Sequence, residues 1–101
     1  METDRLHKFD MAEYLDTEED IAYYLRVTAE EDISLLPAAL GVVARARGMS
    51  ELARSTGLSR ETLYKTLAEG GNPTLSTLSK VLDAYGVRIS LTASNQDVVA
   101  V

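Results

Sequence analysis

Residues 50–69 constrain the fold more than any other part of the chain, because their pattern predicts two short helices joined by a tight turn. Ala53 is small enough for the two helix axes to cross closely, and Gly57 stands where the turn requires a positive φ, which glycine adopts without a Cβ clash. Ser59 can cap the second helix, whose Leu63 faces inward. Two short helices with a glycine-containing turn between them form a helix-turn-helix.

The same spacing also fits two ordinary packed helices of a bundle, and the outward face of the second helix favours the DNA-binding interpretation. Cations and hydroxyls suit a helix in the major groove, because arginine pairs with guanine edges and hydroxyls contact bases or phosphates. A glutamate on this face is able to accept a hydrogen bond from cytosine. Including flanking positions that would contact the DNA backbone, the candidate DNA-binding residues are Ser50, Ser59, Arg60, Glu61, Thr62, Tyr64, Lys65, Asn72 and Thr74.

Three further helices are predicted around this pair, at 17–29, 34–47 and 74–85, with Thr17, Ser34 and Thr74 as their expected caps. Ser50 is the expected cap of the first helix of the pair. The alternation at 87–92 predicts one short strand. The expected fold is mainly α, a five-helix domain over residues 17–92 with a C-terminal β-strand, preceded by a partly ordered arm at 1–16 and followed by a flexible tail at 93–101.

Charge divides unevenly along the chain. Residues 1–35 carry eleven acidic and three basic side chains, whereas residues 36–94 carry seven basic and four acidic ones. A net charge of −6 argues against nucleic acid when it is taken as a whole. The division indicates instead that the acidic third and the basic remainder face different partners. The alternative is that the acidic side chains form an ordinary solvated helix face.

Catalytic and membrane functions have little support in the sequence. The chain has no cysteine and one histidine, His7, so a Cys/His pair or a zinc site cannot be assembled. We expect no enzyme activity, no metal and no cofactor. No segment approaches the roughly 20 apolar residues that a membrane helix needs, and the first residues lack a secretory signal, so a cytoplasmic protein is expected.

Two sets of motifs resemble known families. Leu52-Ala53, Gly57 and Asn72-Pro73-Thr74-Leu75 resemble the Cro/C1-type helix-turn-helix of lambda-repressor-like proteins, although one extra residue precedes the loop. Over roughly residues 9–92 the chain is also similar to HigA-like addiction module antidotes. The segments that carry this similarity are 9–16, 40–49, 56–65 and 71–74, with Met11 where a proline is often found.

The resemblance implies a type II antitoxin that neutralises a basic RelE/ParE-like (HigB-type) toxin and represses its own operon through the helix-turn-helix. The acidic N-terminal third would complement such a toxin. The candidate toxin-binding residues are Phe9, Tyr14, Leu15, Glu18, Glu19 and Tyr23. A homodimer is expected, because proteins of this type read two half-sites; the strand would pair with its copy or join a toxin sheet. The alternatives are a stand-alone repressor and a protein-interaction module without DNA binding.

Overall fold

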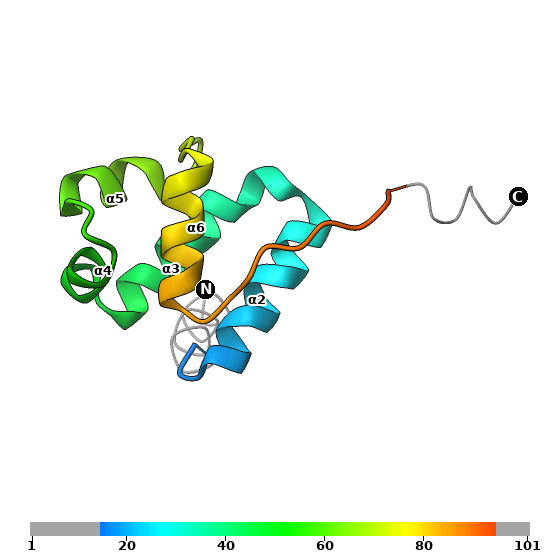
Figure 1. The fold of residues 1–101 in the computed structure, drawn as a ribbon, viewed down its shortest axis with the longest axis horizontal. Coiled ribbons are helices and arrows are strands. Elements are labelled where there is room, and N and C mark those ends of the chain that lie inside the picture. The colour runs from blue at the N-terminus through cyan, green and yellow to red at the C-terminus, as the bar shows by residue number, and fades with distance from the viewer. Residues whose placement is uncertain (1–14, 95–101) are drawn as a thin grey trace, which may run out of the picture.

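Five α-helices and one 3₁₀ turn make up the regular structure of residues 15–94, the part of the chain that the computed structural model describes. In chain order they are α2 (Glu18–Glu31), η1 (Ile33–Leu35), α3 (Leu36–Arg47), α4 (Met49–Thr56), α5 (Arg60–Thr66) and α6 (Leu75–Ala84) (Figure 1). The predicted mainly helical class with five helices is therefore confirmed. Most of the predicted arm and most of the predicted tail lie outside the described residues.

Three helix starts are capped as the sequence predicts. Thr17, Ser59 and Thr74 each accept a hydrogen bond from the backbone N–H three residues further on, at 3.0, 3.0 and 3.1 Å. Each bond satisfies one of the N–H groups that the first turn of a helix leaves without a partner. The local sequence thus fixes where α2, α5 and α6 begin.

Two predicted caps are wrong. The Asp32 carboxylate accepts hydrogen bonds from both the backbone N–H and the hydroxyl of Ser34, at 3.0 and 2.8 Å, so Ser34 lies inside η1. Ser50 lies in the first turn of α4, whose N-cap is Gly48. A single residue, Gly48 with φ 112°, both ends α3 and precedes α4, so no position is left for a serine cap.

The core is built around α3, which packs against α2 on one side and against α4 and α5 on another. Its residues Leu40 and Val43 have no exposed surface. Gly41 allows the closest approach, because a Cβ at this position would collide with the backbone carbonyl of Leu67 just after α5. The buried side chains are Leu15, Ile21, Leu25, Leu36, Ala39, Leu40, Val43, Ala44, Met49, Leu52, Leu63, Leu67, Val81, Leu82 and Tyr85.

One apolar residue of α6 faces solvent. Leu75 belongs by periodicity to the same face as Val81 and Leu82, yet 71 % of its surface is exposed. It is the first residue of α6, and the core begins further along that helix, where Val81 and Leu82 are buried.

The strand predicted at 87–92 is not formed. The backbone N–H of Val87 still bonds to the carbonyl of Leu82 at 2.9 Å, after which the chain leaves the helices as an irregular segment (Figure 1). Ile89 and Leu91 are 43 % and 93 % exposed. A strand requires a second strand for its ladder, and residues 15–94 contain none.

No helix within residues 15–94 has the length and apolar character needed to cross a membrane.

Candidate nucleic-acid interface

The two short helices and the glycine turn predicted from the sequence are present. Gly57 ends α4 with φ 77° and ψ 8°, the left-handed conformation expected there. The Thr56 hydroxyl stabilises the turn, because it donates to the carbonyl of Leu52 at 2.8 Å and accepts from the N–H of Leu58 at 3.2 Å. The helix that follows, α5, is therefore held in a fixed position against α3 and α4.

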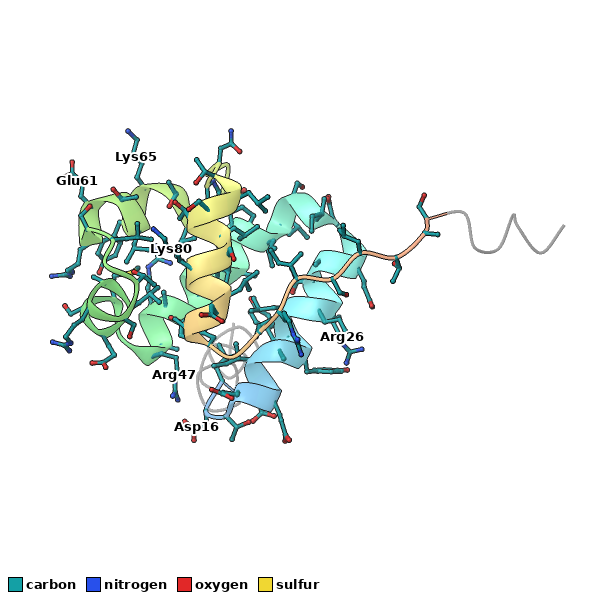
Figure 2. All side chains as sticks on the ribbon, viewed as in Figure 1. Asp16, Arg26, Arg47, Glu61, Lys65 and Lys80 are labelled. Atoms are coloured by element: carbon teal, nitrogen blue, oxygen red, sulfur yellow. The ribbon has the colours of Figure 1, made fainter. Side chains whose placement is uncertain are left out.

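One side of α5 is buried and the other carries polar side chains. Leu63 and the adjacent Leu67 have no exposed surface and anchor the helix in the core. Glu61 and Lys65 project outward from the helix (Figure 2). The exposed predicted residues of this element are Ser59, Arg60, Glu61, Tyr64 and Lys65. The surface that the sequence assigned to a duplex is thus free of the described part of the chain.

Tyr64 lies within cation–π distance of two arginines from different helices. The guanidinium of Arg60 is 5.5 Å from the Tyr64 ring centroid, and that of Arg45, from α3, is 5.9 Å away. Arg60 also donates a hydrogen bond to the Tyr64 hydroxyl at 3.3 Å. Each cation–π contact at an exposed site contributes about 0.5–1 kcal/mol. We call Arg45, Arg60 and Tyr64 the Arg–Tyr cluster.

From the sequence, Arg45, Arg47 and Arg54 are expected only as charges near the DNA backbone. Tyr64, the partner of Arg45, lies 19 residues further along the chain, so no local spacing identifies the pair. The other two arginines are engaged elsewhere. Arg54 pairs with Glu51 on its own helix at 2.7 Å, and Arg47 donates to the carbonyl of Asp16 at 2.8 Å (Figure 2). Arg45 is therefore the α3 cation that joins the face of α5.

Some hydroxyl groups of the candidate site already make hydrogen bonds that cap helices. The Ser59 oxygen accepts the N–H of Thr62 and donates its own proton to the Thr62 hydroxyl at 2.9 Å. A hydroxyl has one proton to give, so Thr62 rather than Ser59 keeps a donor for a phosphate. Thr74 makes the same pair of contacts with Thr77. Ser50 and Asn72 are exposed at the flanking positions.

The candidate toxin-binding residues do not form one surface. Phe9 and Tyr14 lie outside the described residues, and Leu15 is 1 % exposed and belongs to the core. Glu19 and Tyr23 are exposed on α2. The carboxylate of Glu18 lies against Gly86 instead. A Cβ added to Gly86 would be 2.6–2.8 Å from the carboxylate atoms of Glu18, so the two residues are in close contact.

The pKa is raised at two tyrosines, the buried Tyr85 and the partly buried Tyr24. Burial raises the pKa of Tyr85 to about 12, against an opposing effect of the Arg47 charge, and burial also raises the pKa of Tyr24. The Tyr85 hydroxyl has no hydrogen-bond partner among residues 15–94. These groups lie in the core and not on the face of α5.

Comparison with known proteins gives a family and one relative. The family model described as "probable addiction module antidote protein" matches residues 5–93. An uncharacterized protein of Haemophilus influenzae is 47 % identical over 93 residues, which cover 91 % of this chain and 96 % of that protein. No solved structure gives a significant match. The match spans the whole described fold, and the chain belongs to the probable addiction module antidote protein family.

Proposed function

We propose that this protein is the antitoxin of a type II toxin–antitoxin module, that it neutralises a RelE/ParE-like (HigB-type) toxin, and that it binds operator DNA to repress its own operon. The observation that carries the DNA-binding part is the exposed face of α5 with the Arg–Tyr cluster at its edge. The antidote family supports the toxin partner. In this role the protein acts in the cytoplasm, without enzyme activity or a cofactor.

The acidic composition is compatible with DNA binding because the charges are separated between elements. The first turn of α2 contains Glu18, Glu19 and Asp20, whereas the last turn of α3 contains Arg45 and Arg47. A duplex at α5 meets Arg45 of the second group, whereas Arg47 contacts Asp16. Local potential at the binding face, rather than net charge, governs the approach of a phosphate backbone.

Each α5 side chain is assigned a role by its chemistry. Arg60 pairs with a guanine edge, with its guanidinium already oriented by Tyr64. Lys65 and Arg45 contact phosphates as charges, and Thr62 donates its remaining hydroxyl proton. Glu61 accepts from cytosine, and the flanking residues Ser50 and Asn72 contact the DNA backbone. The Thr74 hydroxyl donates to Thr77 and is not assigned a phosphate contact. Two copies of α5 are needed to read half-sites about 34–36 Å apart, so the active species is a homodimer.

Two measurements on the full chain test this function. A fluorescence-anisotropy titration with the protein's own promoter should give specific binding that weakens with salt. Co-expression with the product of the adjacent reading frame should relieve that product's toxicity. Promoter binding without toxin relief would identify a stand-alone repressor, and relief without promoter binding would identify a protein-interaction module.

A further inference from the structure

The solvent-facing side of α2 has apolar residues at its centre. Tyr23 and Val27, one helical turn apart, are 62 % and 42 % exposed, while Ile21 and Leu25 on the opposite side are buried. A helix that only covers a core carries polar residues on the side away from it. The packing of residues 15–94 therefore does not explain why Tyr23 and Val27, rather than polar residues, occupy the exposed side of α2.

Four carboxylates flank this apolar centre. Glu19 and Asp20 precede Tyr23 by four and three positions, so all three share one side of the helix. Glu30 and Glu31 follow Val27 at the same spacings. None of the four pairs with a cation of residues 15–94. The one cation of the helix, Arg26, lies over the Tyr23 ring at 5.4 Å.

The acidic residues at the end of α2 do not serve the helix itself. Negative charge is unfavourable at a helix C-terminus, because the helix dipole is negative there. α2 has no basic residue in its last turn, yet it carries Glu30 and Glu31 in that turn. An interaction with a group outside α2 would account for these two carboxylates.

We propose that the outer face of α2, formed by Tyr23, Val27 and the flanking Glu19, Asp20, Glu30 and Glu31, is a docking site for a basic protein with an apolar groove. Tyr23 and Val27 enter the groove, and the carboxylates meet cations along its rim, as in other helix-in-groove complexes. Charge complementarity selects a basic partner over the same acidic α2 face of a second copy. The identification of this partner as the toxin rests on the proposed function.

This site differs from the set of toxin contacts expected from the sequence. Glu18 is excluded, because its carboxylate lies against Gly86. Leu15 is excluded by its burial. Val27, Asp20, Glu30 and Glu31 are added, so the centre of the site moves from the chain's N-terminal segment to the middle of α2.

The test uses the full chain and the purified product of the adjacent reading frame, with affinity measured by calorimetry. The variant Tyr23→Ala with Val27→Ala should bind at least about tenfold more weakly, because residues at the centre of an interface dominate affinity. Leu75→Ala, which removes an exposed apolar side chain from α6, is the control and should bind as the unmodified chain does. Circular dichroism should show both variants folded, since alanine favours a helix.

A second pair of variants tests the charges. Glu30→Gln with Glu31→Gln should lower the association rate several-fold and flatten its dependence on salt. Glu69→Gln with Asp83→Asn removes two exposed carboxylates elsewhere and should leave the rate unchanged. The first pair should not lower the thermal midpoint, because the change relieves the unfavourable interaction with the helix dipole.

The outcomes separate this inference from the function on which it rests. If the unmodified chain does not bind the neighbouring product, the toxin partner and the docking site are both overturned. If the unmodified chain binds and the α2 variants bind equally well, only the docking site is overturned. Loss of dimerisation in Tyr23→Ala with Val27→Ala, seen by sedimentation with partner binding intact, would show a self-interface and overturn the inference as well.

Discussion

α2 and α5 both rest on α3, and their outer faces have opposite chemistry. The outer face of α2 has apolar residues at its centre with carboxylates around them, as described for Tyr23 and Val27. The outer face of α5 has an aromatic ring close to two guanidinium groups, one of them from α3, with hydroxyls and a lysine nearby. In Figure 1 the two helices lie on opposite sides of the bundle.

The contrast shows why the whole-chain charge is a poor guide to what this protein binds. A net charge of −6 averages one acidic helix with the basic end of another. Interactions between exposed charges are screened over about 8–10 Å at physiological salt. Each partner therefore meets the potential of the helix that it approaches, and the two faces are best tested separately.

The largest expected effect comes from Gly41, which holds α5 against α3. Gly41→Ala places a Cβ against the backbone carbonyl of Leu67, which cannot move without displacing the end of α5. We expect a loss of about 3 kcal/mol in the free energy of unfolding, because overpacking against backbone is costly. Urea denaturation measures it. Val42→Ala, at the neighbouring exposed position, is the control; equal stability of the two variants would contradict the close approach.

Loss of the Arg–Tyr cluster should remove DNA binding while the α2 face remains intact. Arg60→Ala should weaken promoter binding about 10–100-fold, since a bidentate arginine–guanine contact contributes about 1–3 kcal/mol. Arg45→Ala should have a smaller effect in the same direction. Anisotropy titration measures both variants, with Arg54→Ala, already paired to Glu51, as the control. If Arg60→Ala binds DNA normally, the assignment of the site to α5 is wrong.

The variant Tyr85→Phe tests whether the unpaired Tyr85 hydroxyl destabilises the core on which α2 and α5 both pack. Tyr85→Phe should raise stability by about 1 kcal/mol at pH 7, because it removes a buried polar group that lacks a partner. The folded-state pKa is raised to about 12 from 10.0. The unfolded chain therefore releases this proton first, and stability should fall from about pH 10 to pH 12.

Thermal unfolding across this alkaline range measures the effect, and Tyr85→Phe should lose less stability there than the unmodified chain. An identical alkaline loss in the Tyr85→Phe variant would show that another group is responsible.

The smallest effect concerns Lys65. If its ammonium contacts a phosphate, Lys65→Ala should weaken promoter binding only a few-fold and reduce the slope of log affinity against log salt by about one. Titrations at several salt concentrations give the slope. Lys80→Ala removes an exposed cation from α6 and should leave the slope unchanged; a change of equal size in both variants would point to non-specific attraction.

The elements of the fold that depend on neighbouring residues were predictable from the sequence. The caps at Thr17, Ser59 and Thr74 and the left-handed turn at Gly57 are local in origin, and all four were predicted correctly. The exposure of the α5 face also followed from helical periodicity. The prediction that Ser50 caps α4 was wrong, because α4 begins directly after Gly48. Periodicity does not show which residue between two adjoining helices is the cap.

Features that depend on distant contacts were not predictable. The burial of Leu15 and the approach of Arg45 to Tyr64 require the packing of separate elements. The alternation at 87–92 is a valid strand pattern, but the absence of a ladder partner within residues 15–94 is a property of the whole fold. The same limit applies to α2, whose apolar centre becomes visible only once its buried side is known.

The placement of α2 and α5 on different sides of α3 has a consequence for how the two proposed activities combine. In the proposed arrangement a protein seated on α2 and a duplex seated on α5 contact different surfaces, so we expect one molecule to hold both partners. Repression and neutralisation can then proceed at the same time. The ratio of the two proteins in the cell, rather than competition for a shared surface, would set how much promoter is covered.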